Sequence, residues 1–238
     1  MELVTAPAKL TVSLRITGVR DDGYHLIDAE MVTLDLADEL TFSPGDGLEV
    51  RAAASGEAVP TGDDNLVRRA LAAVGRTAHV RLTKVIPAGA GLGGGSADAA
   101  AVLRWAGVDD PAVAVALGAD VPFCVRGGRA RVRGVGEVVE PLAPLERTYT
   151  LFTPPFGCST AAVYRAWDRL GGPQGIGAND LEAAALAVEP GLAEWRDRLA
   201  EATGATPVLA GSGSTWFVEG AHPGDGRLVT RTSIPPPP

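Results

Sequence analysis

The chain has 238 residues, which is enough for one large domain or two small domains with a hydrophobic core. Its net charge of −8 argues against nucleic-acid binding, because proteins that bind nucleic acids present a basic face to the phosphates. Its apolar runs fall short of membrane-spanning length, so we expect no membrane partner.

The cysteines and histidines indicate no metal site. Cys124 and Cys158 form no ligand pattern, and the three histidines are scattered along the chain. Two free thiols are typical of a protein from a reducing compartment. The first seven residues also lack the basic segment and apolar core of a signal peptide. We therefore expect a soluble, cytoplasmic protein.

The first predicted element is a strand within residues 2–20. The apolar residues at positions 10, 12, 14 and 16 share one face of this strand, which places Lys9 and Thr11 on the other face. Only two of the 21 basic residues are lysines, Lys9 and Lys84. In a chain so rich in arginine, we expect a lysine to be present for its own chemistry, as a compact charge on a flexible stem.

A turn signal at 21–23 comes next, and two further strands are predicted around 30–36 and 39–42. Tyr24 and His25 lie between the turn and these strands. Taken alone, the two side chains are equally well explained as a turn-flanking pair that packs on a strand.

A helix and a glycine-rich loop follow. The helix opens at Asn65 and runs through residue 74, and Asn65 or one of the two aspartates before it can cap it. After a predicted strand at 79–86, the segment 87–96 has five glycines in seven positions, which lets the backbone approach a ligand closely. Ser96 lies where the next helix begins, and the unpaired N–H groups and helix dipole favour an anion there. The segment therefore predicts a phosphate-binding loop.

Two similar motifs and one plain explanation compete with this interpretation. The spacing Gly89-x-Gly-x-x-Gly94 fits the dinucleotide fingerprint, which requires a strand ending in an acidic residue about 20 positions on. Asp109 and Asp110 lie near that position, but Pro111 follows and no apolar strand precedes them. The P-loop pattern fails, because no Gly-Lys-Ser/Thr closes the loop. A glycine-rich turn that merely joins a strand to a helix is the third alternative.

Asp120 precedes a Val-Pro pair. Since the residue before a proline favours an extended conformation, Val121 is predicted to be extended. Asp120 then either caps a turn or points into a cleft. A proline-containing linker is predicted at 140–147.

The C-terminal third is predicted to contain strands and helices in alternation. We expect a strand at 148–153, a helix at 159–170 capped by Ser159, a helix at 179–202 interrupted by a proline, and a strand, glycine turn and strand at 207–218. The proline-rich tail, 233–238, is predicted to be disordered.

These separated stretches together resemble the GHMP kinase superfamily and, within it, the family of 4-diphosphocytidyl-2-C-methyl-D-erythritol kinases. The glycine motif alone indicates only the superfamily, whereas the runs that contain His25 and Asp120 indicate the family. The matching motifs occur in the family's order: Ala6-Pro-Ala-Lys-Leu10, Gly18-x-Arg-x-Asp-Gly-Tyr-His25, Asn65-Leu66, Pro87-x-Gly-Ala-Gly-Leu-Gly-Gly-Gly-Ser96, Leu117-Gly-Ala-Asp-Val-Pro-Phe123, Asn179-Asp-Leu-Glu182 and Gly211-Ser-Gly-Ser-Thr215.

The resemblance implies an α+β fold of two domains with the active site in the cleft between them. The N-terminal domain, 1–146, would be ribosomal-protein-S5-like and carry the ATP loop, and the C-terminal domain, 147–232, would be ferredoxin-like. The implied reaction transfers the γ-phosphoryl group of ATP to the 2-hydroxyl of 4-diphosphocytidyl-2-C-methyl-D-erythritol, in the non-mevalonate isoprenoid pathway. ATP and Mg²⁺ are the expected cofactors, and a monomer or homodimer is the expected assembly.

The resemblance also implies roles for individual residues. Asp120 would be the catalytic base and Lys9 its cationic partner, while Ser96, from its place at the helix start, is a candidate Mg²⁺ ligand. The implied ATP-binding residues are Asn65 and Leu66 near the adenine, with Pro87, Gly89, Ala90, Gly91, Leu92, Gly93, Gly94, Gly95 and Ser96 around the phosphates. The implied substrate-binding residues are Thr11, Tyr24, His25, Tyr164, Gly211, Ser212 and Gly213.

These roles agree with the chemistry. Phosphoryl transfer depends on positioning and on neutralising charge, and a carboxylate at position 120 can take the hydroxyl proton. A nearby lysine favours the ionised carboxylate. Tyrosine rings offer flat surfaces for a pyrimidine, and a histidine can read its polar edge. For residues 211–215, a plain hairpin turn is the alternative.

The chain departs from the family's pattern in three places. Thr11 stands where the family usually has asparagine, and a hydroxyl replaces only one of the two hydrogen bonds of an amide. The segment 105–117 is shorter than the family's, and 219–230 lacks the expected helix, which leaves 220–226 as a loop and thins the core. Two alternatives therefore stay open: another small-molecule GHMP kinase, acting on mevalonate, homoserine or a sugar, and a degenerate nucleotide-binding protein.

Overall fold

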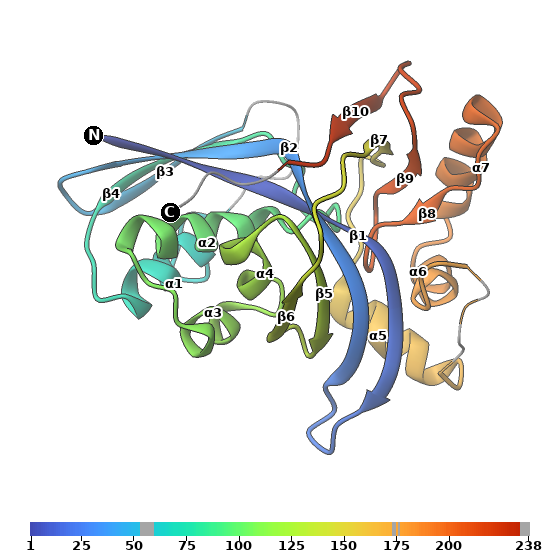
Figure 1. Cartoon of the computed structure of the whole chain (residues 1–238), viewed down its shortest axis with the longest axis horizontal. Coiled ribbons are helices and arrows are strands. Elements are labelled where there is room, and N and C mark those ends of the chain that lie inside the picture. Colours follow the sequence, from blue (N-terminus) through green and yellow to red (C-terminus); the bar gives the residue numbers. More distant parts are fainter. Residues whose placement is uncertain (53–59, 173–174, 176, 234–238) are drawn as a thin grey trace.

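The computed structural model describes residues 1–52, 60–172, 175 and 177–233. Its strands form two sheets, and the predicted α+β class with two domains is confirmed (Figure 1). The strands of the first sheet are β1 (Glu2–Val19), β2 (His25–Ser43), β3 (Gly47–Ala52), β4 (His79–Lys84), β5 (Arg129–Gly134) and β6 (Val138–Pro141). The strands of the second sheet are β7 (Thr148–Phe152), β8 (Val208–Leu209), β9 (Trp216–Glu219) and β10 (Arg227–Arg231).

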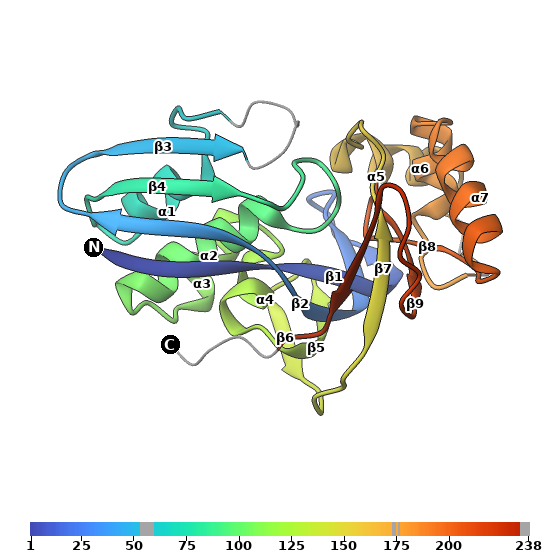
Figure 2. The ribbon, with the colours of Figure 1, turned by 90° about the horizontal axis from the view of Figure 1, so that it is seen from above.

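The first sheet has six strands in the order β3-β4-β2-β5-β6, with β1 paired to β2. All its pairings are antiparallel except that of β3 with β4. The second sheet has the order β10-β7-β9-β8 and is antiparallel throughout. Figure 2 shows the long β1–β2 pair running from the first sheet to the side of the second.

The prediction of two separate strands around 30–36 and 39–42 is wrong. Both segments belong to β2, which runs unbroken from His25 to Ser43. One part of β2 pairs with β5 and another with β4, so neighbouring strands hold it along most of its length. Asp38, which looks like an interruption in the sequence, is buried in an ion pair with Lys84, and the strand continues through it.

The prediction that positions 10, 12, 14 and 16 share one strand face is also wrong. The β1–β2 register shifts between Thr11 and Ser13, which is a bulge or comparable irregularity. Leu10 accordingly packs in one hydrophobic cluster, whereas Leu14 and Ile16 pack in another. Because of this irregularity, β1 contributes side chains to both hydrophobic clusters.

All the predicted helices are present. The helices are α1 (Leu66–Ala73), α2 (Gly94–Ala106), α3 (Pro111–Leu117), α4 (Val121–Arg126), α5 (Thr160–Arg169), α6 (Glu182–Val188) and α7 (Leu192–Thr203). Helices α1 to α4 lie on one side of the first sheet, and α6 and α7 lie beside the second (Figure 1). The side chain of Asn65 accepts a hydrogen bond from the amide of Val67 and caps α1. Ser159 caps α5 as predicted.

Two short helices were not expected. Asp110 caps α3 through the amide of Ala112, which gives this aspartate a local structural role. The prediction of an extended Val121 is wrong, because Val121 opens α4. Pro122 lies in the first turn of that helix, where the missing N–H has no intrahelical partner to lose.

The C-terminal part agrees with the expectations where the structure describes it. The interrupted helix is the pair α6 and α7, and residues 220–226 form a loop without a helix. Of the tail predicted to be disordered, 234–238 lie outside the described residues. None of the helices in the described part is long and apolar enough to cross a membrane.

Asn179 ties the two parts of the chain together. Its neighbours Ala178 and Asp180 exchange backbone hydrogen bonds with Leu14 of β1. Its buried side chain donates to the carbonyls of Leu209, at 2.9 Å, and Gly211, at 2.6 Å. The glycine turn at 211–215 is thereby fixed relative to β1.

We expect Asn179→Ala to destabilise the protein by about 2–4 kcal/mol, because two buried carbonyls lose their donor and each unpaired group costs about 1–3 kcal/mol. Urea unfolding measures the change. Replacement of the exposed Asp109 by alanine is the control and should leave stability nearly unchanged. A variant Asn179→Ala within about 0.5 kcal/mol of the wild type would contradict this role.

Candidate active site

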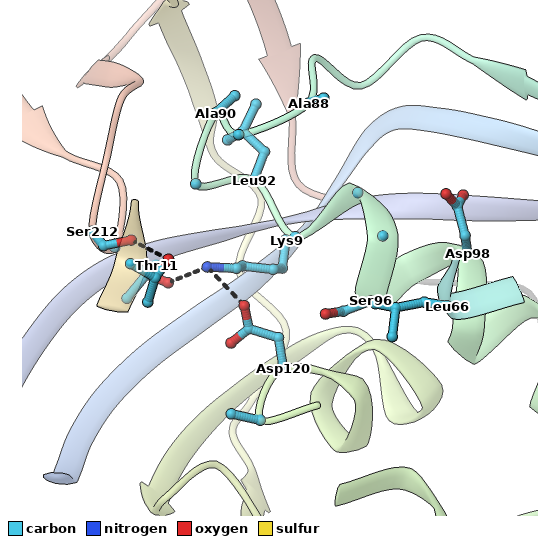
Figure 3. Close-up of a pocket in the computed structure, with 18 of the residues that line it drawn as sticks. Lys9, Thr11, Leu66, Ala88, Ala90, Leu92, Ser96, Asp98, Asp120 and Ser212 are labelled. Atoms are coloured by element: carbon cyan, nitrogen blue, oxygen red, sulfur yellow. Dashed lines mark hydrogen bonds and ion pairs between the residues drawn. The ribbon is translucent and has the colours of Figure 1, made fainter. Parts of the chain in front are cut away.

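A cavity of about 560 Å³ is lined by residues from both parts of the chain. They come from β1, β2 and β4, from the start of α1 with the residues before it, and from the glycine loop with the start of α2. The others come from residues 119 and 120 at the start of α4, from Val135, from α5, and from the turn between β8 and β9. Figure 3 shows Leu66 and Asp98 on one side of a central Lys9–Asp120 pair, and Thr11 and Ser212 on the other.

The glycine loop packs directly against the turn of the C-terminal part. Gly91 has a φ of +76°, and a Cβ there would lie 2.3 Å from the carbonyl oxygen of Ala210 and 2.6 Å from that of Gly213. The amide of Thr215 donates to the carbonyl of Ala90 at 3.1 Å. Only glycine fits at position 91, because any side chain would push the loop away from the turn.

The loop ends at the N-terminus of α2, which begins at Gly94, two residues before the predicted start. Gly93 is the N-cap with a φ of 69°, and the first turn of α2 carries no acidic residue. The free amides and the positive end of a 13-residue helix therefore face the cavity and favour an anion. All the predicted ATP-binding residues line the cavity.

The two competing explanations of the loop have no support in the structure. The preceding strand, β4, runs antiparallel to β2, and Asp110 caps a helix instead of ending a strand, so the dinucleotide fingerprint does not apply. A plain turn would not require the close contact that Gly91 makes or line a cavity over its whole length.

Lys9 lies at the centre of the cavity. Its ammonium is 3.3 Å from a carboxylate oxygen of Asp120 and donates to the hydroxyl of Thr11 at 3.1 Å. Its stem packs so closely on Gly93 that a Cβ at that residue would lie 2.7 Å from Lys9 Cγ. Only 5% of Lys9 is exposed. The ammonium is therefore held between the phosphate loop and the carboxylate.

Asp120 points into the cavity and does not cap α4. It stands at the N-cap position of that helix, but its side chain makes no capping hydrogen bond. The carboxylate is about one-third exposed, and Figure 3 shows it directed at Lys9 across the cavity. Of the two interpretations that the sequence left open, the structure supports the one with the side chain in the cleft.

A second lysine, Lys84, lies under the glycine loop in a buried cluster with Asp38 and Asp98. Its ammonium bonds to both carboxylates, at 2.8 Å to Asp98. Asp38 also accepts hydrogen bonds from the backbone amides of Val85 and Ile86, which fixes the segment that precedes the glycine loop. The rarity of lysine in the sequence was the only signal for this cluster, and neither aspartate was predicted.

One oxygen of Asp98, Oδ1, is buried without a hydrogen-bond partner in the described part of the chain. Burial, together with the charge of Asp38, raises the pKa of Asp98 to about 7, although Lys84 acts in the opposite direction. Burial alone would lower the pKa of Lys84, but its two aspartates outweigh that effect and raise it. One ammonium thus holds two carboxyl groups, and one of them takes up a proton near neutral pH.

Two aromatic side chains, His25 and Tyr164, also line the cavity, and their rings are 4.7 Å apart. Burial, and then the charge of Asp120, raises the pKa of the Tyr164 hydroxyl, so this tyrosine stays neutral. Tyr24 does not line the cavity. It is 63% exposed, and its ring lies 6.0 Å from the guanidinium of Arg20 in the neighbouring turn.

The turn at 211–215 contributes two residues to the cavity, Gly211 and Ser212. The hydroxyl of Ser212 hydrogen-bonds with that of Thr160 at 2.8 Å, which joins the turn to the start of α5. Gly213 does not line the cavity, and its carbonyl packs against Gly91 instead.

The sequence analysis did not find Asp98, Asp168 or Thr160. None of the three belongs to a recognisable sequence motif. The fold places Asp98 and Thr160 in the cavity lining and brings Asp168 into contact with His25, which lines the cavity. The described residues hold no cluster of three or more histidine, cysteine, aspartate or glutamate side chains arranged for a metal ion.

Comparison with known proteins places the chain among small-molecule kinases. The family model described as GHMP kinases N terminal domain matches residues 65–108. The 4-diphosphocytidyl-2-C-methyl-D-erythritol kinase of Paracoccus denitrificans (strain Pd 1222) is 42% identical over 234 residues, which cover 89% of this chain and 84% of that protein. The relative of the same name from Moorella thermoacetica (strain ATCC 39073 / JCM 9320) is 42% identical over 80% of this chain and 73% of its own length.

Solved structures agree. A crystal structure of 4-(cytidine 5'-diphospho)-2C-methyl-D-erythritol kinase superposes with a TM-score of 0.76 at 33% identity, covering 98% of this chain and all of that one. The mevalonate kinase of L. major superposes with a TM-score of 0.65 at 12% identity, over 98% of this chain and 96% of that one. The second similarity shows a shared fold alone.

We expect the stability of Asp98→Asn to depend on pH differently from that of the wild type. The pKa of Asp98 is higher in the folded chain than in the unfolded chain, where aspartate titrates near pH 4, so its stabilising contribution is complete below about pH 4 and is lost as the pH rises through 7. Asparagine has no such contribution to lose. The difference in unfolding free energy, variant minus wild type, should therefore rise by about 2–3 kcal/mol between pH 5 and pH 8.

Urea unfolding at several pH values measures this difference. The exposed Asp109→Asn is the matched control, and its curve should run parallel to the wild type. Parallel curves for Asp98→Asn and the wild type would contradict the raised pKa.

Proposed function

The chain belongs to the family of 4-diphosphocytidyl-2-C-methyl-D-erythritol kinases, and we propose that its cavity is where the γ-phosphoryl group of ATP passes to the 2-hydroxyl of that substrate. This is a step of the non-mevalonate route to isoprenoid precursors. The observation that carries the assignment to this cavity is the Lys9–Asp120 pair, which lies beside the glycine loop and the start of α2.

ATP binds with its phosphates on the glycine loop. The amides of the loop and the first turn of α2 supply hydrogen bonds and the positive end of a dipole, so the loop needs no lysine of its own. The nucleoside lies toward Leu66, on the Asp98 side of the central pair (Figure 3). Asn65 acts indirectly, because its amide caps α1 and bonds to the carbonyl of Pro60 at 2.7 Å, which positions Leu66.

The acceptor alcohol lies between Thr11 and Asp120. Its oxygen forms the new bond to the γ-phosphorus, while the bond from that phosphorus to the β,γ-bridging oxygen breaks and ADP leaves. The proton of the alcohol passes to the carboxylate of Asp120. Lys9 holds the carboxylate and Thr11 in place, and its charge offsets the negative charge on the phosphoryl oxygens.

The residues present also fit Mg²⁺. This ion prefers a few protein oxygens together with substrate phosphates and water. Within the described part of the chain, the hydroxyl of Ser96 has no hydrogen-bond partner. Figure 3 shows this hydroxyl pointing toward Asp120. Ser96 would be the protein ligand of Mg²⁺, and the ion would neutralise charge on the phosphates. The use of ATP and the two free cysteines support a cytoplasmic location.

The purified protein, with ATP and Mg²⁺, should release ADP with 4-diphosphocytidyl-2-C-methyl-D-erythritol in a coupled assay. The precursor without the cytidine group, mevalonate and homoserine should give background rates, because they leave the end of the cavity at His25 and Tyr164 empty. Equal or better rates with an acceptor that lacks cytidine would support a different GHMP kinase.

The variant Asp120→Asn is the control for the chemistry and should lower kcat at least about a hundredfold, the usual scale for a general base. If the wild-type protein shows no activity with any of these acceptors, the result would favour a degenerate nucleotide-binding protein.

A further inference from the structure

Helix α5 lines the cavity through Thr160 and Tyr164. His25, the first residue of β2, packs against two aromatic rings of this helix: Tyr164 at 4.7 Å, tilted by 39°, and Trp167 at 5.5 Å, edge-on at 84°. Only 9% of the His25 side chain is exposed. The imidazole is therefore held firmly in a fixed plane between the two parts of the chain.

Asp168, the residue after Trp167 on α5, pairs with this imidazole. A carboxylate oxygen of Asp168 lies 2.8 Å from His25 Nε2. An ionised carboxylate only accepts hydrogen bonds, so Nε2 must carry the proton. In the neutral ring the other nitrogen, Nδ1, then has a free lone pair and is an acceptor. Within the described part of the chain, no group bonds to Nδ1, and His25 lines the cavity.

The base of the substrate belongs at this end of the cavity. Leu66 and Ser96 lie on one side of the Lys9–Asp120 pair, and Thr11 and Ser212 lie on the other (Figure 3). Tyr164 lies one helical turn after Thr160, whose hydroxyl bonds to Ser212 on the opposite side of the pair. The aromatic wall of His25 and Tyr164 is thus the surface left for a second, pyrimidine base.

We propose that Asp168 is a positioning residue that makes the site select cytosine over uracil by fixing the tautomer of His25. Cytosine carries a donating amino group at ring position 4 beside an N3 that accepts, whereas uracil carries an accepting carbonyl at position 4 beside an N3–H that donates, so the test group is the one that faces position 4. An Nδ1 lone pair accepts from the amino group and opposes the carbonyl. This inference rests on the proposed function, since it takes the cytidine group as the ligand of this wall.

The test reverses the hydrogen bond at Nε2. In Asp168→Lys the ammonium only donates, so the Nε2 lone pair accepts from it and the proton moves to Nδ1. Lysine suits the last turn of a helix, and Asp168 is about half exposed, so the fold should tolerate the change. Asp168→Glu keeps an acceptor and is the rescue variant. Asp197→Lys, on an exposed aspartate of α7, is the control for the added charge.

The first readout is the ¹⁵N NMR spectrum of the histidines without substrate. We expect the wild type and Asp168→Glu to show His25 protonated at Nε2, and Asp168→Lys to show it protonated at Nδ1. A wild-type His25 protonated at Nδ1, or an unchanged tautomer in Asp168→Lys, would overturn the proposal. This readout does not depend on enzymatic activity.

The second readout is the ratio of kcat/KM for the cytidine substrate to that for its uridine analogue. We expect this ratio to fall at least about tenfold in Asp168→Lys, mainly through KM, and to be retained in Asp168→Glu and Asp197→Lys. An equal loss with both bases would mean a merely structural role and would overturn the proposal. A wild type that turns over neither base would instead overturn the proposed function.

Discussion

The position of one ammonium group, that of Lys9, determines the geometry of the whole site. Its stem packs on Gly93 of the phosphate loop, its backbone amide donates to the carbonyl of Leu92, and its charge reaches Asp120 and Thr11. A single buried cation thereby contacts the glycine loop, Asp120 and Thr11 at once. Because phosphoryl transfer needs little covalent help from the protein, such positioning is the main contribution the chain can make.

The same constraint joins the two parts of the chain. The carbonyls of Ala210 and Gly213 pack against Gly91, in the space that a Cβ would fill in any other residue. Asn179 hydrogen-bonds to Gly211 in the same turn, and its neighbours bond to β1. The glycine loop and the turn at 211–215 therefore pack as one unit. His25 and Asp168 form a second bridge between the parts, at the opposite end of the cavity. These contacts hold the two parts of the chain together around the cavity.

Features that depend on local chemistry could be predicted from the sequence: the glycine loop, the cap at Asn65 and the cap at Ser159 all follow from a few adjacent residues. Features that depend on distant partners could not. The unbroken course of β2 past Asp38 requires Lys84, and the bulge after Thr11 reflects two separate cores. The resemblance to a family located Lys9 and Asp120, but it could not place the exposed Tyr24 or find Asp168, which acts through His25.

The central claim is that Lys9 and Asp120 act as one unit, and a double-mutant cycle on kcat/KM for ADP formation tests it most directly. We compare Lys9→Met, Asp120→Asn and the double variant, with Arg51→Met, at an exposed position of β3, as a charge-removing control outside the site. If the two residues act together, the double variant should be within about threefold of the more damaged single variant, because the first substitution already destroys the unit. If the two losses multiply instead, the residues act independently and the account is contradicted.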